Sequence, residues 1–198
     1  NYSKILEIKS SFGNDALGGK KIFGIRLKKV NYNKRIFNKN LLGGSILDGG
    51  IYPVSLMVDI FDLYNKNLIK SLDNFDCKKN ISKDIDLSST LNLLVNNVKV
   101  ELKTSLIEKL NNDLSIHAND QIVKLNGIFN ISSNSYITLQ NKDGFQKIKN
   151  TDNENSYFYE IKKISDMILN DLSFKKIINK KFIKIENNIK LLSKWYSY

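Results

Sequence analysis

The stretch N-N-V-K-V-E-L-K-T-S, residues 96–105, decides how the middle of this chain folds. After the two asparagines, apolar residues alternate with charged ones, which is the period of a strand that buries one face. Asparagine tolerates the positive φ that both central positions of a two-residue hairpin turn require. We therefore predict a hairpin turning at Asn96-Asn97, a strand to about Lys103 and a short helix over T-S-L-I-E-K-L-N-N-D. A helix from residue 88 to 112 is the alternative, because its leucines also fit one helical face.

More strands are expected on both sides of this hairpin. Eight of the ten glycines fall in the first fifty residues, many of them paired, and they predict flexible turns between strands. The segments I-F-G-I-R-L-K-K-V and Y-P-V-S-L-M-V-D-I-F-D-L both alternate and are predicted as strands, the second followed by a hairpin turning at residues 65–67. Residues 121–131 and 135–139 are predicted strands, and N-K-D-G, residues 141–144, is a predicted turn.

The composition and periodicity of the sequence change after a polar linker at residues 149–156. Beyond residue 157 there is no glycine or proline, and apolar residues recur at helical spacing in a heptad-like seam. We predict an α+β fold: a β-rich, antiparallel, sandwich-like domain in residues 1–150, followed by C-terminal amphipathic helices in an extension over residues 151–198.

Composition limits the possible chemistry. The formal net charge is +11, which favours anionic partners, yet only Arg26 and Arg35 among 31 basic residues are arginines. We interpret this lysine-rich composition, with its many asparagines and isoleucines, as the signature of an AT-rich genome. Cys77 is the only cysteine and His117 the only histidine, so we predict no disulfide, no metal site and no cofactor. No apolar stretch approaches the length of a membrane span, and a removed segment before Asn1 remains open.

Two catalytic motifs were tested against the sequence. The segment S-F-G-N-D-A-L-G-G-K-K fails as a phosphate-binding loop, because Gly19 is an extra residue and a strand follows where a helix is needed. A magnesium-dependent nuclease would use Glu101 and Lys103, which share a strand face, together with an upstream acid such as Asp86. The predicted hairpin instead places the neutral Asn92 opposite Glu101, so this nuclease motif lacks its partner.

The C-terminal helix is the most informative segment for function. Its lysines lie mostly off the apolar seam, and it ends in the aromatic run W-Y-S-Y. The seam can pack on its own domain, dock on a partner protein, or lie on an anionic surface. We predict a non-enzymatic structural or interaction subunit that binds other protein subunits of an assembly through this helix. The predicted partner-binding residues are Ile178, Phe182, Ile185, Ile189, Leu192, Trp195 and Tyr196. The alternative is a protein that acts on nucleic acid, either a lysine-rich binder or the Glu-x-Lys nuclease.

Overall fold

The structure is a computed structural model that describes residues 4–18, 21–22, 25–26, 29–63, 72–151, 154, 156–169 and 174–198. Its strands are β1 (Ile5–Gly13), β2 (Lys21–Ile22), β3 (Ile25–Arg26), β4 (Leu72–Ser82), β5 (Ile85–Val95), β6 (Val98–Ser105), β7 (Asp113–Ala118), β8 (Gln121–Asn126), β9 (Tyr136–Asn141) and β10 (Gly144–Lys149). Its helices are η1 (Arg35–Phe37), η2 (Lys39–Leu41), α1 (Ser45–Gly49), α2 (Ile51–Leu63), α3 (Ser156–Leu169) and α4 (Phe174–Ser197).

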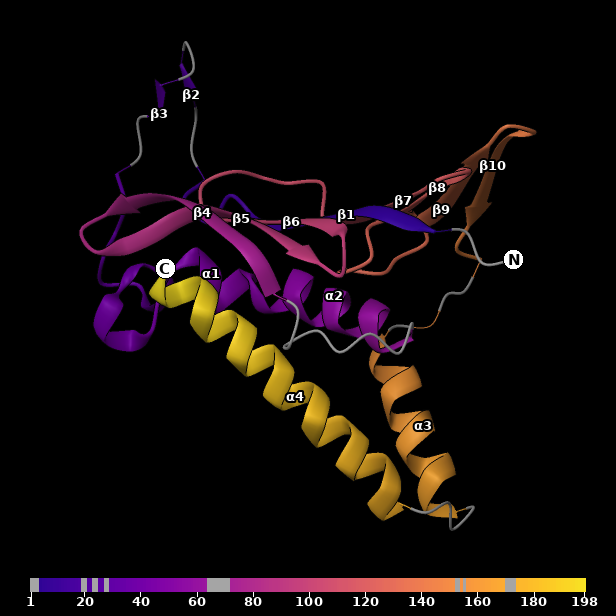
Figure 1. Cartoon of the computed structure of the whole chain (residues 1–198). Helices are drawn as coiled ribbons and strands as arrows, with labels where there is room; N and C mark the ends of the chain where they lie inside the picture. Colours follow the sequence, from indigo (N-terminus) through magenta and orange to yellow (C-terminus); the bar gives the residue numbers. More distant parts are fainter. Residues whose placement is uncertain are drawn as a thin grey trace.

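One mixed sheet organises the chain (Figure 1). Its eight strands are ordered β10-β9-β8-β7-β1-β6-β5-β4, and β2 and β3 form a separate two-stranded sheet. The pair β1–β6 is parallel, whereas the other neighbours in the large sheet are antiparallel. The α+β class with C-terminal helices is therefore confirmed. The antiparallel sandwich is corrected, because β1 enters the sheet beside β6 in the same direction and helices, not a second sheet, cover one face.

The hairpin of the opening stretch is confirmed. Val95 pairs with Val98 across a turn in which Asn96 and Asn97 have φ of 49° and 65°. The predicted helix after β6 is wrong, and a loop connects β6 to β7. The backbone N–H of Leu106 donates to the carbonyl of Leu87, and the Leu106 side chain is buried in a small cluster with Phe37. This anchoring holds the chain against β5 and prevents a continuous helix.

The predicted strand in residues 52–63 is also wrong, because this segment forms the core helix α2. Val54, Met57, Val58 and Phe61 are all buried and recur at the helical spacing of three and four residues. They pack against the helix-side face of the sheet with Ile8, Leu91 and Leu102, among others. A helix buried on so many sides also shows alternating apolar positions, which misled the strand prediction. The predicted hairpin at residues 65–67 lies outside the described residues.

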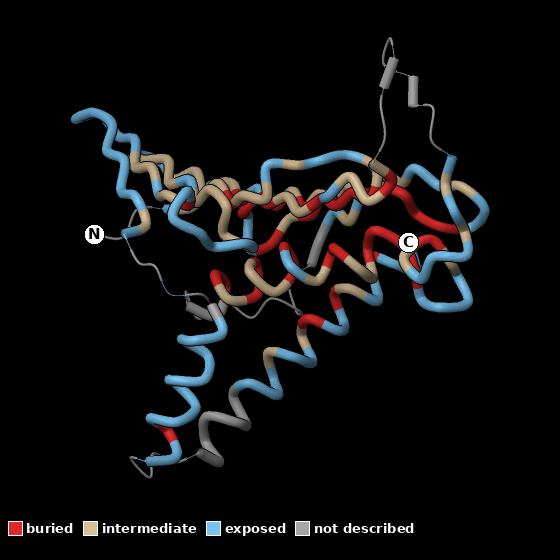
Figure 2. Tube along the Cα trace, turned by 180° about the vertical axis from the view of Figure 1, so that it is seen from behind, coloured by how far each residue is buried: buried red, intermediate tan, exposed pale blue. Residues whose placement is uncertain are grey.

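The C-terminal helix α4 crosses beneath the sheet and buries its last turns, whereas α3 points away from the sheet (Figures 1 and 2). Leu191 and Trp195 are fully buried in the same core as α2. Helix α3 is exposed along most of its length, with Met167 as its buried residue. The division into domains at residue 150 stays a prediction.

Within the described part of the chain, no single helix combines the length and the apolar composition of a membrane span. The bent pair Lys39–Gly49 and Ile51–Phe61 meets both criteria only when its two helices are taken together.

Candidate functional site

The candidate site surrounds the junction between α1 and α2, which we call the kink (residues 49–51). Gly50 connects the two helices with helical φ and ψ, and its carbonyl accepts the backbone N–H of Val54. The segments Lys39–Gly49 and Ile51–Phe61 are bent by 44° relative to each other. Because Tyr52 lies in the first turn after this bend, the position of its ring depends on how the kink is held.

Asp86 anchors the start of α1. Its Oδ2 accepts hydrogen bonds from Ser45 Oγ and from the backbone N–H of Ile46, both at 2.7 Å, and the residue is only 6% exposed. The register of β4 and β5 shifts between Asn80 and Ile81, and this bulge aims the Asp86 side chain at the helix layer. The carboxylate thereby satisfies N–H and O–H donors at a buried helix start.

Both ends of α1 contact the sheet at β1 and β6. Thr104 Oγ1 donates to the carbonyl of Ser45 at 3.0 Å. A Cβ built on Gly49 would lie 2.5 Å from Thr104 Oγ1 and 3.2 Å from the ring of Phe12. Only glycine allows this approach of helix backbone to sheet.

An aromatic cluster lies over this contact. The rings of Tyr52 and Phe12 stack with centroids 4.1 Å apart, and Phe129 meets both edge-on at 5.8 and 5.5 Å. Phe12 comes from the end of β1 and Phe129 from the loop after β8. Tyr52 is 44% exposed, and within the described residues its hydroxyl makes no hydrogen bond. The ring is therefore held by two aromatic neighbours, while nearly half of the residue is open to solvent.

A charged pair lies next to the kink. Arg35 of η1 donates from Nη2 to Oδ1 of Asp48, which is four residues before Tyr52. Both side chains are partly exposed. The site thus combines a phenol, an aromatic surface and an ion pair around one glycine-rich bend, a combination that suits binding of a polar, ring-shaped ligand.

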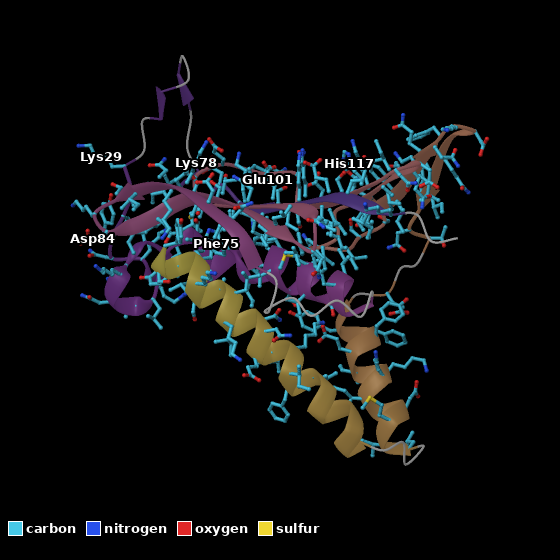
Figure 3. All side chains as sticks on the ribbon, viewed as in Figure 1. Lys29, Phe75, Lys78, Asp84, Glu101 and His117 are labelled. Atoms are coloured by element: carbon cyan, nitrogen blue, oxygen red, sulfur yellow. The ribbon has the colours of Figure 1, made fainter. Side chains whose placement is uncertain are left out.

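The residues of the predicted nuclease do not meet. Glu101 and Lys103 lie on the face of the sheet opposite the helices, where Figure 3 also places His117. Asp86 faces α1 and lies six residues along β5 from Asn92, the partner of Glu101, which is about 20 Å at the rise of a strand. Among the residues that the structure describes, no group of three acidic, histidine or cysteine side chains could hold a metal ion.

The predicted partner-binding residues divide into two groups. Trp195 is fully buried and Leu192 packs against the core of the chain itself, so these two are intramolecular contacts. The other side chains that the structure describes are exposed: Phe182, Ile185, Ile189 and Tyr196. The side chain of Ile178 lies outside the described set. Partner binding through the exposed group stays a prediction.

Sequence analysis missed Asp48, Tyr52 and Phe12. A signal for the first two was present: the glycine pairs 43–44 and 49–50 bracket S-I-L-D, and Y-P follows. We read those pairs as flexible turns, whereas closely spaced glycines also mark helix backbone packed tightly on a sheet. Nothing near Phe12 in the sequence indicates that its ring meets Tyr52, because the contact depends on the sheet order.

Comparison with known proteins places this fold. No protein-family model matches the sequence, and no curated protein matches it. Among solved structures, KijD10, a 3-ketoreductase from Actinomadura kijaniata in complex with NADP and TDP-benzene, is similar with a TM-score of 0.61 and 14% identity, over 85% of this chain and 47% of that chain. An aldose-aldose oxidoreductase from Caulobacter crescentus, complexed with glycerol, gives 0.62 and 11%, over 84% and 46%. The UDP-N-acetylglucosamine 3-dehydrogenase GnnA from Acidithiobacillus ferrooxidans gives 0.57 and 9%, over 85% and 46%.

These comparisons correct the functional prediction. The three solved structures named above are oxidoreductases, which overturns the prediction of a non-enzymatic structural or assembly subunit with its nucleic-acid-acting alternative. Neither the structure nor the comparisons support the interpretation of an AT-rich genome. The chain spans about half the length of the solved structures it matches.

Proposed function

We propose that this chain is the substrate-binding half of an oxidoreductase that acts on a carbohydrate. Two kinds of support converge. The fold is shared with three oxidoreductases, two of which are named for a sugar or a nucleotide-linked sugar. The kink independently presents the type of surface that sugars bind, an aromatic face bordered by polar groups.

Tyr52 carries the proposal. Its ring is stacked on Phe12 with centroids 4.1 Å apart, and the residue is 44% exposed. A phenol in this position can pass a proton to or from the oxygen atom of a bound sugar, which is the general acid–base step of carbonyl–alcohol interconversion. Asp48 and Arg35 border the same kink and can bind sugar hydroxyls or a charged substituent.

The chain does not fit a dinucleotide by itself. The glycine fingerprint G-x-G-x-x-G of dinucleotide-binding folds is absent from the 198 residues, since no two glycines are two positions apart. The mixed sheet is also not the doubly wound parallel sheet that carries this fingerprint. We assign no step of the reaction to a dinucleotide here, and the proposal places its binding outside this chain.

The test separates binding from turnover. The isolated chain is titrated with a panel of aldoses, keto-sugars and nucleotide-linked sugars, and binding is followed by amide NMR shifts at the kink. Extract from the cells that make the protein is then depleted of it and assayed for reduction of the keto-sugars. Adding back the wild-type chain restores the rate, whereas Tyr52→Phe lowers it about 100-fold or more, the usual contribution of a positioned acid–base group.

Tyr52→Phe keeps the stacked ring, so its fold is preserved and a loss of rate reports the hydroxyl alone. Tyr198→Phe, which removes the hydroxyl of an exposed tyrosine at the end of α4, is the matched control and restores the wild-type rate. The proposal fails if depletion leaves sugar reduction unchanged, or if Tyr52→Phe restores the full rate.

A further inference from the structure

We infer that Trp195, near the end of α4, is a positioning residue that sets the orientation of Tyr52 through the kink. This inference rests on the proposed role of Tyr52 toward a substrate. The two residues are 143 positions apart in the sequence, and they are linked by the backbone of Gly50.

The indole is held rigidly from the sheet side. Trp195 is fully buried, and its Nε1–H donates to Ser89 Oγ at 2.9 Å. Ser89 is itself buried on β5 and donates from Oγ to the carbonyl of Lys78 at 3.2 Å. Because the hydroxyl both accepts from the indole and donates to β4, the ring has a fixed orientation beneath the helices.

The other edge of the indole meets the kink. A Cβ added to Gly50 would lie 3.1 Å from Cζ3 of Trp195, so the six-membered ring lies directly against the bare backbone at this position. From the sheet, Phe12 and Thr104 approach the neighbouring Gly49 in the same way. Gly49 and Gly50 are therefore packed between the sheet and the indole, and Gly50 lies two residues before Tyr52.

Other contacts fasten α4 to α2 farther from the bend. Asn188 donates from Nδ2 to Ser55 Oγ at 3.3 Å, and Lys184 forms an ion pair with Asp59. Leu191 is buried in the core one turn before Trp195. These contacts hold the helix in place without the indole, so a change at Trp195 acts on the kink more than on the attachment of α4.

The position of the Tyr52 hydroxyl therefore depends on Trp195. A small rotation about the kink swings the phenol away from its stack on Phe12, and misplacement of a reacting group by about 1 Å can cost about 100-fold in rate. Trp195, which the sequence predicted as a partner-binding residue, thus packs inside the chain and supports the kink that carries Tyr52.

The test compares two large-to-small changes in one core. Trp195→Phe removes the hydrogen bond to Ser89 and the ring edge against Gly50, whereas Leu191→Ala makes a cavity in the same cluster and keeps the indole against Gly50. Ser89→Ala, which removes the hydroxyl that accepts from the indole and donates to Lys78 but keeps the indole ring, is a milder third variant. The readouts are the NOEs between the Tyr52 and Phe12 rings and the turnover number and KM in the add-back assay.

We expect Trp195→Phe to weaken the Tyr52–Phe12 NOEs and to lower the turnover number about tenfold with a smaller change in KM, as for a group misplaced in the reacting geometry. Ser89→Ala weakens the NOEs and lowers the turnover number by a smaller amount. Leu191→Ala leaves the NOEs and the turnover number within twofold. Unchanged NOEs in Trp195→Phe, or equal losses in Leu191→Ala, overturn the inference. If the wild-type chain reduces no sugar, the proposed function fails, and the NOEs alone still decide whether Trp195 orients the ring.

Discussion

Asn92 on β5 lies directly opposite Glu101 on β6. The same face carries cross-strand partners of opposite charge, with Lys9 beside Glu101 and Glu7 beside Lys99. Neighbours of opposite sign stabilise a solvated sheet face modestly. The Glu-x-Lys pattern is therefore explained by the sheet and the loop after it, because Glu101 lies opposite Lys9 and Lys103 pairs with Glu108 at 3.9 Å.

Asn92→Asp places a second carboxylate opposite Glu101. Like charges directly across a strand pair repel, so we expect a loss of up to about 1 kcal/mol in the free energy of unfolding. Urea denaturation followed by circular dichroism measures the change, and because salt screens exposed charges, the loss shrinks at high ionic strength. Thr90→Asp is the control, since Thr90 faces Lys103 and an acid there has a cation opposite. Equal losses in both variants contradict the cross-strand explanation.

Gly44→Ala tests the close approach at the start of α1. Gly44 has φ of +119°, and an added Cβ would lie 2.3 Å from Oδ1 of Asp86. Gly144 has a similar φ of +138° but no atom within 4 Å of its added Cβ. Both substitutions pay backbone strain of about 1–3 kcal/mol, and Gly44→Ala is expected to exceed Gly144→Ala because of the clash. The urea concentrations at which the two variants unfold measure the difference. If Gly144→Ala is destabilised as much as Gly44→Ala, the clash with Asp86 is not the cause.

Asp86→Ala leaves the Ser45 hydroxyl and the Ile46 N–H without their buried acceptor. Loss of hydrogen bonds to a charged group typically costs about 1.5–3 kcal/mol, and we expect a destabilisation in this range. Glu108→Ala is the control: its carboxylate is 53% exposed and pairs with Lys103 at 3.9 Å. An exposed pair contributes about 0–1 kcal/mol, so this variant stays near the wild type in urea denaturation. The role of Asp86 as an anchor is refuted if the two variants unfold at the same urea concentration.

Phe182→Ser, Ile185→Ser and Ile189→Ser combined test partner binding through the exposed part of α4. All three side chains are at least half exposed, so we expect unfolding within about 1 kcal/mol of the wild type, as for surface changes. If the exposed seam binds another protein, copurification from the native source falls while the fold is intact. Truncating the helix cannot answer this question, because Trp195 belongs to the core. Unchanged copurification with all three serines removes the seam as a binding surface.

Two turns and the C-terminal helices were predicted correctly from local patterns. The asparagine pair at residues 96–97 turned as expected because its positive φ is a property of those residues themselves. The N-K-D-G turn also formed, with Asn141 accepting the backbone N–H groups of Asp143 and Gly144. The helices after residue 156 followed their periodicity.

Long-range structure escaped prediction for physical reasons. The α2 segment is apolar on several sides, so a period of two was as visible as a period of 3.6, and the significance of Pro53 near its start was missed. The site depends on Tyr52, Phe12 and Phe129, which only the sheet order brings together. Glycines 44 and 49 carried the signal, but close approach and flexibility look alike in a sequence.

The parallel pairing of β1 with β6 has a consequence for biogenesis. Residues 5–13 leave the ribosome before residues 98–118, from which both of their sheet neighbours are drawn. Strand β1 must therefore wait, without these partners, until residues 98–118 have been translated, and contacts of such sequence separation form slowly. Nascent chains that stall before β7 hold an incomplete sheet centre and expose its apolar face to chaperones and proteases.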